Sequence, residues 1–339
     1  MKKLNLQILA IAAVAAVFSS CGGNSGGGEK SVNKGSFPMV TTPSYITDRE
    51  QAVRYIAKNF WDDFFKIGLD GKEKAGAVHG VDSLAFLNSF GMYAQLATMA
   101  GVQTMEAPMA ELFHNLDSLA LAGERKPLLK VMEQMEHYFF DPNSPVLDEE
   151  MYLRALNGIL ACKSLSDTDK MQYEYQHRIC SLNRVGTPAA DFSFRQLVAS
   201  NHLPDSSPQM YSPTPPKGYA DKTLYKNVKG EYTLLFFNNP DCGACGEILD
   251  AIKDSHLAEL VHQKKLAVVA MYTDEDLSAW ARNREKYPKE WMYAFDHKLV
   301  LRDNNIYGLR AIPSLYLLDK DKRVILKDAT VDMVINALL

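Results

Sequence analysis

Cysteine is scarce in this chain of 339 residues. Only five cysteines are present, and they stand at positions 21, 162, 180, 242 and 245. So few cysteines exclude a small domain that is held together mainly by disulfides. The apolar content of 47% and the charged content of 23% are those of an ordinary globular protein, and the length leaves room for two domains.

An excess of positive charge is also absent. Lys and Arg number 37 against 41 Asp and Glu, which gives a formal net charge of −4. Without a basic stripe we expect no nucleic-acid partner. No Gly-rich phosphate loop is recognisable, and we expect no cofactor. The methionines at 92, 99, 105, 109, 132 and 135 have helical spacing and no paired histidine, which is typical of core packing rather than of a copper site, so we expect no metal.

An apolar run long enough to cross a bilayer is missing at the N-terminus. After Lys2 and Lys3 the apolar stretch 8–18 has 11 residues, whereas a membrane-spanning helix needs about 20. This length is typical of a signal peptide. The stretch ends in Phe18-Ser19-Ser20-Cys21-Gly22, which resembles the lipobox of bacterial lipoproteins, with Phe18 where leucine is usual. The resemblance implies a signal peptide at 1–20 and a lipid on Cys21. Ordinary secretory cleavage nearby is the alternative.

The residues after Cys21 bear on the compartment. Gly22 does not resemble the aspartate that retains some lipoproteins at the inner membrane, and no acidic run follows that resembles a surface-export signal. We therefore expect a lipid-anchored protein of the cell envelope on the periplasmic side, with the outer membrane favoured over the inner. Residues 21–45 begin rich in Gly, Ser and Lys and predict a flexible tether, with a root-mean-square reach of roughly 25–30 Å.

Residues 46–183 have the pattern of a helical domain. Thr47-Asp48-Arg49-Glu50 is a capping-box pattern that predicts the start of the first helix. A second helix is predicted from Asp82 to Met99. Further predicted features are Pro108 and Pro127 as first residues of helices, and a helical hairpin formed by Asp148–Cys162 and Ser166–Leu182. The sequence predicts that this domain contains helices only.

Two cysteines follow a short apolar run in the C-terminal half. Leu234–Phe237 predicts a buried strand, which ends at Asn238-Asn239-Pro240. Asp241 is the predicted N-cap of the next helix, so Cys242 and Cys245 fall on its first turn. Unpaired amides and the helix dipole stabilise a thiolate at Cys242. A capping Asp241 would compete for those amides and raise the pKa of Cys242 again.

Downstream patterns complete a known arrangement. Strands are predicted at 266–272, 314–318 and 324–326, a helix at 333–339, and Ile312-Pro313 precedes the second of these strands. Together with Gly186–Phe192 as a first strand and the CxxC motif, these features make residues 184–339 resemble a thioredoxin-fold domain of the membrane-tethered thiol-disulfide oxidoreductase type. Residues 46–183 resemble a helical domain of unknown function that precedes such domains in bacterial lipoproteins. The expected fold class is an all-α domain followed by an α/β thioredoxin-like fold.

The resemblance implies an enzyme that exchanges thiols and disulfides. Cys242, nearest the helix start, would attack, and Cys245 would resolve the mixed disulfide. Pro313 would be cis and face the motif, and the backbone of Ile312 would pair with an extended substrate. The expected substrates are envelope proteins or small thiols, with an unidentified electron donor at the membrane. Gly243-Ala244 lacks the histidine of strongly oxidising relatives, which favours a reductase.

The site departs from the family pattern at three positions. Asp241 stands where the family usually has tryptophan, and Gly246 where it often has lysine or arginine. Phe236 stands where an acidic residue often assists proton transfer. Glu247 is the candidate base in its place. These departures bear on the rate and the redox direction more than on the redox role.

Two alternatives remain open, together with a question about an inserted segment. Cys242 and Cys245 with His256 and His262 have a spacing close to that of a zinc finger, although these cysteines open a helix. The chain could also be an envelope scaffold whose thioredoxin fold is a docking module with little redox activity. The proline-rich segment 201–221 predicts an inserted surface loop, or a loop on which client proteins dock.

Overall fold

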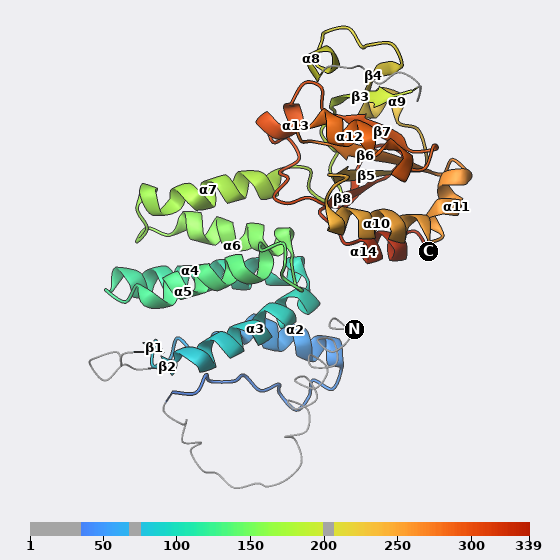
Figure 1. Cartoon of the computed structure of the whole chain (residues 1–339). Coiled ribbons are helices and arrows are strands. Elements are labelled where there is room, and N and C mark those ends of the chain that lie inside the picture. Colours follow the sequence, from blue (N-terminus) through green and yellow to red (C-terminus); the bar gives the residue numbers. More distant parts are fainter. Residues whose placement is uncertain (1–34, 68–75, 199–206) are drawn as a thin grey trace. The chain divides into compact units, whose positions relative to one another are not determined.

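The computed structural model describes residues 35–67, 76–198 and 207–339. The chain divides between Cys180 and Ser181 into two compact units. Each unit has its own core, because one buried cluster draws its residues from 37–180 and two others draw theirs from 189–334. A helical unit is followed by a unit built on a mixed sheet (Figure 1), which confirms the expected fold class.

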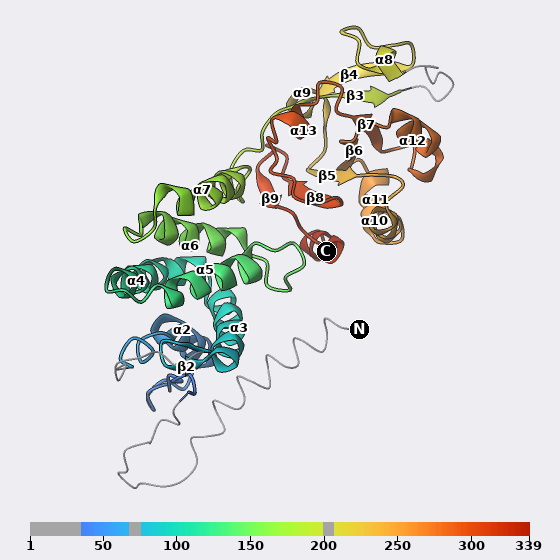
Figure 2. The ribbon, with the colours of Figure 1, turned by 60° about the vertical axis from the view of Figure 1, so that its left-hand side comes forward.

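The first unit is mainly helical. Its longer elements are α2 (Arg49–Asn59), α3 (Ser83–Ala100), α4 (Val102–Leu121), α5 (Lys126–Phe139), α6 (Glu149–Ala161) and α7 (Asp167–Ser181). Helices α4, α5, α6 and α7 lie side by side in both views (Figures 1 and 2). The expectation of helices only was wrong in one place, because β1 (Ala77–Val78) and β2 (Val81–Asp82) pair in an antiparallel ribbon.

The helix boundaries follow local chemistry, with two corrections. Asp48 rather than Thr47 caps α2, and its carboxylate accepts from the Gln51 amide at 2.9 Å. Pro127 lies at the start of α5 as predicted. Pro108 does not begin a helix but lies inside α4. The two flanking methionines, Met105 and Met109, are fully buried, so their packing compensates for the backbone hydrogen bond that proline cannot make.

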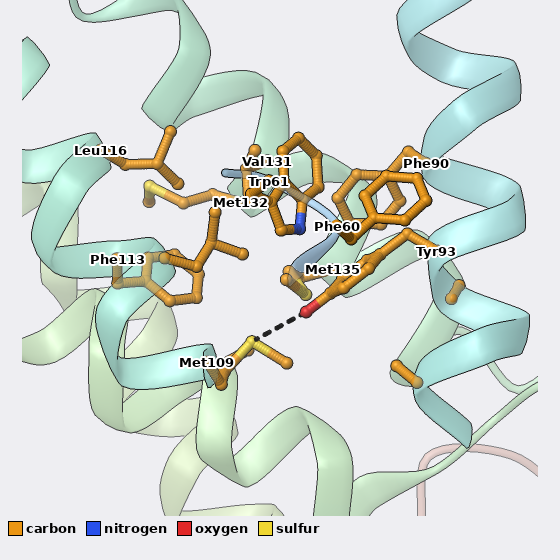
Figure 3. Packing of buried hydrophobic residues seen from close by; sticks show 14 of the residues in the cluster. Phe60, Trp61, Phe90, Tyr93, Met109, Phe113, Leu116, Val131, Met132 and Met135 are labelled. Carbon is orange, nitrogen blue, oxygen red and sulfur yellow. Dashed lines mark hydrogen bonds between the residues drawn. The ribbon is translucent and has the colours of Figure 1, made fainter. Parts of the chain in front are cut away.

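Aromatic and methionine side chains fill the core of the first unit. Figure 3 shows Phe60, Trp61 and Phe90 around Tyr93, whose hydroxyl donates to the Met109 sulfur at 3.9 Å. Met105, Met109, Met132 and Met135 are fully buried, as predicted for core packing, whereas Met99 is half exposed. The flexible methionine side chains fit the gaps that the rigid rings leave.

The second unit is built on a seven-stranded sheet with the order β4-β3-β7-β6-β5-β8-β9. The strands are β3 (Ser193–Leu197), β4 (Tyr219–Thr223), β5 (Tyr232–Asn238), β6 (Leu266–Tyr272), β7 (Met292–Phe295), β8 (Ser314–Leu318) and β9 (Val324–Leu326). Strands β5, β6 and β7 are mutually parallel, and the other neighbours are antiparallel. Three strands have their predicted bounds, and β5 extends beyond the predicted one at both ends.

The predicted first strand was displaced. Residues 186–192 form no strand, and β3 begins at Ser193. Pro188 makes only an isolated bridge with Arg323, because proline has no amide hydrogen to continue a ladder. The last helix, α14 (Val331–Ala337), begins two residues before its predicted start.

Helices cover both faces of the sheet. Because side chains alternate along a strand, Leu234 and Phe236 of β5 face one core, while Leu235 and Phe237 face the other. The first core is closed by α10 (Gly243–Lys253), α11 (Leu257–His262), α12 (Leu277–Arg282) and α14. The second is closed by α9 (Leu224–Asn227) and α13 (Val300–Asp303). Figures 1 and 2 show α10 and α14 together on one side of the sheet.

The described part of the proline-rich insertion is docked on the sheet. It contains the short helix α8 (Ser207–Met210) and the edge strand β4. The guanidinium of Arg195, which is fully buried, donates to both carboxylate oxygens of Asp221 at 2.6 and 2.9 Å and to the Met210 carbonyl at 2.6 Å. Met210 is itself buried in the core. The segment is therefore not a loop throughout, because α8 and part of β4 lie within it, whereas residues 211–218 form the predicted inserted loop.

Candidate functional site

The two cysteines of the motif lie where the central strand passes into a helix. Strand β5 ends at Asn238, and α10 begins at Gly243 with Cys242 as its N-cap. Cys242 is half-buried, whereas Cys245, one turn further along, is only 1% exposed. One sulfur is thus open to a substrate and the other is shielded.

Asp241 is not the helix cap that the sequence suggested. Its amide donates to the Asn239 side-chain oxygen at 2.9 Å, and the Cys242 amide donates to the Asn239 carbonyl at 3.0 Å. This tight turn moves the helix start one residue onward. The Asp241 carboxylate instead accepts from the Asn283 side-chain amide at 2.9 Å. Cys242 therefore occupies the position at the free amides that an aspartate would otherwise take.

The helix start favours the thiolate of Cys242. The Cys245 amide lowers the pKa of Cys242 most, and the Cys245 thiol and the Ala244 amide lower it further, while partial burial opposes them. The net result is a pKa below the ordinary thiol value. Asp241 is not among the groups that shift this pKa.

The surroundings of Cys245 shift its pKa in the opposite direction. Burial raises the pKa of Cys245 to about 12, and the Asn239 amide, whose nitrogen lies 3.4 Å from the sulfur, acts in the opposite direction. The side chain and charge of Cys242 and the carboxylate of Asp274 raise it further. At neutral pH Cys245 is a protonated thiol beside a more acidic one.

The loop before the motif is held by the connection between β6 and β7. Sequence reasoning missed these contacts, although Asp274 follows the end of β6 by two residues. Because the carboxyl ends of neighbouring parallel strands meet at one edge, that position was a detectable signal. The contacts are Tyr287 hydroxyl to Asn238 Oδ1 at 2.7 Å, Asn239 Nδ2 to Asp274 Oδ2 at 2.6 Å, Lys286 Nζ to the Pro240 carbonyl at 3.1 Å, and Asn283 Nδ2 to Asp241 Oδ1 at 2.9 Å.

Pro313 lies at the same edge of the sheet. The Ile312–Pro313 peptide bond is cis, as the resemblance implied. Ser314 pairs with Phe237, so Pro313 lies beside the end of β5 from which the loop to Cys242 departs. Ile312 and Cys242 are both half-buried against the same core. The fold thus gathers Cys242, Cys245, Ile312 and Pro313, whereas Cys21 lies outside the described residues, as do the predicted signal peptide and most of the predicted tether.

The structure shows what surrounds the positions at which the sequence departs from the family pattern. Phe236 is fully buried in the core under the motif. Glu247, the predicted base, is exposed on α10 while Cys245 is buried. The carboxylate that acts on Cys245 belongs to Asp274 instead.

The zinc-finger spacing does not assemble into a site. His256 precedes α11, and its ring nitrogen lies 3.2 Å from the Leu338 carbonyl. Within 35–67, 76–198 and 207–339, no three side chains of His, Cys, Asp or Glu gather as metal ligands would. Over the same ranges, no helix has both the length and the apolar character to cross a bilayer.

Comparison with known proteins agrees with the fold. A thioredoxin-like protein from Bacteroides caccae is 27% identical in sequence, with a TM-score of 0.75, and the match covers 89% of this chain and 97% of that one. The C-terminal unit has a thioredoxin-like fold. The model of a family described as a domain of unknown function (DUF5106) matches residues 19–183, so the thioredoxin-like domain follows a helical region without assigned chemistry.

Two other solved structures each match 46% of this chain. The C-terminal domain of an uncharacterized protein from Bacteroides fragilis is 41% identical, and the match covers 46% of this chain and 97% of that one, with a TM-score of 0.38. The thioredoxin domain of a thiol-disulfide oxidoreductase from Bacteroides vulgatus is 18% identical, with coverage of 46% and 95% and a TM-score of 0.34. No curated protein matches this chain.

Proposed function

We propose that this protein is a thiol-disulfide oxidoreductase of the cell envelope that reduces or exchanges disulfides through its Cys-Gly-Ala-Cys motif. The observation that carries the proposal is the opposite setting of two neighbouring thiols. The accessible Cys242 has a lowered pKa, and the buried Cys245 has a pKa raised to about 12. A thiolate is the attacking species in disulfide exchange, so this pair separates the attacking group from the resolving one.

The reaction has two displacements. The Cys242 thiolate attacks one sulfur of a substrate disulfide, which forms a mixed disulfide and releases the first substrate thiolate. Cys245 then gives up its proton and attacks the Cys242 sulfur, which releases the second substrate thiolate. The motif becomes a disulfide, and two electrons pass to the substrate. A reductant, proposed to be a membrane electron donor, must return the motif to the dithiol.

The proposed substrate position is at the sheet edge beside the motif. The backbone of Ile312, next to Pro313, is the proposed partner for an extended segment of a substrate protein, because it adjoins the end of β5 where Cys242 begins its helix. Protein disulfides and small disulfides are the proposed substrates. Gly243-Ala244, which offers no histidine between the cysteines, supports the reductase direction.

The proposed anchor is a lipid on Cys21 that holds the two domains on the periplasmic side of a membrane, the outer one favoured. The support is the lipobox-like sequence that ends at this cysteine. Mass spectrometry of the mature N-terminus tests it. An acylated Cys21 is expected, and Cys21→Ala should remain an uncleaved precursor or leave the membrane fraction. An unmodified N-terminus at another residue contradicts the anchor.

A trapping experiment tests the function. In the full chain, Cys245→Ser should accumulate mixed disulfides on Cys242 in cells, because the resolving thiol is missing. Cys242→Ser is the matched control and should trap nothing. The wild-type chain should also reduce a small aromatic disulfide. Absence of both adducts and reduction would leave the alternative, a scaffold that uses the fold as a docking module.

A further inference from the structure

Asn239 connects the buried cysteine to a carboxylate on the neighbouring loop. Its backbone nitrogen lies 3.4 Å from the Cys245 sulfur, and its side-chain nitrogen lies 2.6 Å from Asp274 Oδ2. The side-chain oxygen of Asn239 accepts from the Asp241 amide at 2.9 Å. Both ends of the Asn239 amide group are therefore engaged, and the residue is fixed while its backbone N–H points at the sulfur.

The strand register produces this arrangement. Asn238, the last residue of β5, pairs with Tyr272, the last residue of β6, in a parallel ladder. Asn239 and Asp274 leave the two strands at the same edge of the sheet and at nearly the same level. Asp274 is exposed. Its carboxylate is therefore hydrated and needs no positively charged partner inside the protein.

Strand β5 itself supplies no acidic side chain beneath the motif, and the carboxylate near Cys245 comes from Asp274 instead. Phe236 points into the core beneath the motif, and it offers no group that could accept or donate a proton. Among the described residues, the hydrogen-bond partners of the Cys245 sulfur are the Asn239 amide and the Cys242 side chain. A change at Asp274 can therefore reach the sulfur by two routes, through Asn239 and through its own charge.

We propose, on the basis of the redox function above, that Asp274 is a positioning residue that acts on Cys245 through Asn239. It holds the Asn239 N–H in line with the sulfur. During resolution, the Cys245 S–H bond loses its proton to water and the sulfur carries negative charge before it attacks Cys242. The N–H donor stabilises that charge. The new bond joins the two motif sulfurs, and the bond from Cys242 to the substrate breaks.

Two substitutions separate the routes. Asp274→Asn removes the charge but keeps an oxygen that can accept from the Asn239 side chain. Asp274→Ala removes both the charge and the acceptor. Comparing the two variants cancels the effect of charge and leaves the effect of the hydrogen bond. Asp250→Asn is the matched control, because Asp250 is an exposed carboxylate on α10 that pairs with Lys253 at 3.1 Å.

The assay uses an aromatic disulfide whose halves are coloured thiolates. Attack by Cys242 on the reduced full-length protein releases the first half, and resolution by Cys245 releases the second. We expect Asp274→Ala to slow only the second release, relative to Asp274→Asn, by roughly threefold to tenfold, the range of one hydrogen bond. Asp250→Asn should change neither release.

The outcomes are distinguishable. If Asp274→Ala and Asp274→Asn give the same second rate, Asp274 acts through charge or not at all, and the positioning role is wrong. If the slowing falls equally on the first release, the role in resolution is also wrong. Failure of the proposed function would show differently, as a wild-type protein that releases neither half. Circular dichroism of both variants, which change an exposed side chain, checks that the fold is retained.

Discussion

At the scale of single residues, the same thiol group has different pKa values in different environments, as Cys162, Cys242 and Cys245 show. Cys162 is buried in the helical unit, and burial raises its pKa to about 12, with the Asp117 carboxylate adding to the effect. Cys245 has a similar pKa for the same main reason, whereas the helix start lowers the pKa of Cys242. Reactivity in this protein is thus a property of position rather than of residue type.

A labelling experiment tests the predicted order of thiol reactivity, in which Cys242 reacts first. With iodoacetamide on the reduced protein, the rate at Cys242 should rise with pH and reach half of its plateau below pH 9.0, the ordinary thiol value. The sign follows from the lowered pKa, because half of the thiol is ionised when the pH equals the pKa. Mass spectrometry should find Cys242 modified first at neutral pH, and Cys242→Ser should abolish the fast phase. Faster modification of Cys245 would contradict the assignment.

Asp241 gives a second prediction at this scale, and it reverses the expectation from sequence. As a cap, Asp241 would have raised the pKa of Cys242, and Asp241→Asn would have lowered it. Because its carboxylate instead accepts from Asn283 and leaves the helix amides to Cys242, Asp241→Asn should leave the pKa of Cys242 unchanged within the error of a titration. Thiolate absorbance against pH measures it. A clear drop would show that the charge reaches the sulfur.

At the scale of elements, helices α4 and α6 pack closely at a glycine. Gly158 of α6 lies against Phe113 of α4, and a Cβ on Gly158 would come within 2.4 Å of the Phe113 ring. The ring is fully buried in the core, so it has little room to move. Glycine, which is otherwise unfavourable inside a helix, is therefore required here by the neighbouring helix.

Gly158→Ala should accordingly destabilise the protein. Overpacking of this kind typically costs about 1–3 kcal/mol, which exceeds the gain of about 1 kcal/mol that alanine offers over glycine in a helix. Gly246→Ala is the matched control, since a Cβ there meets nothing within 4 Å. It should leave stability unchanged or raise it. Urea unfolding of the two variants decides, and equal stability would mean that α4 and α6 adjust freely.

At the scale of the whole molecule, the two units have separate interiors. The core of the helical unit ends with Cys180, and the two cores of the thioredoxin-like unit begin with Ala189. A unit with a complete core of its own can fold independently. The chemistry proposed for the motif uses residues from the second unit only.

A fragment of residues 181–339 should therefore fold without the rest of the chain. We expect one cooperative unfolding transition and the same two-phase reaction with the aromatic disulfide as in the full chain. Circular dichroism and the release assay measure these. A fragment that is unfolded, or folded but inactive, would show that the helical unit contributes to the site.

The sequence by itself determined four strands of the second unit, β5, β6, β8 and β9, and the position of its two thiols. Strands such as β6 and β8 are continuous apolar runs that end at turn residues, and such a run predicts a strand buried on both faces. Their bounds were predicted correctly. Cys242 and Cys245 were predictable for the same reason, because a strand, a turn and a helix follow one another within a few residues.

Only the tertiary structure decided what surrounds those thiols. Asp274, Asn283 and Tyr287 reach the loop before the motif because β5 and β6 pair in parallel, and no local pattern states that register. Pro108 stays within α4 because Met105 and Met109 are buried there, which outweighs its local preference to begin a helix. Local helix preferences amount to less than about 1 kcal/mol for ordinary residues and about 3 kcal/mol for proline, and packing or hydrogen bonding between distant segments supplies as much. Where the two conflict, the contacts made by the folded chain prevail.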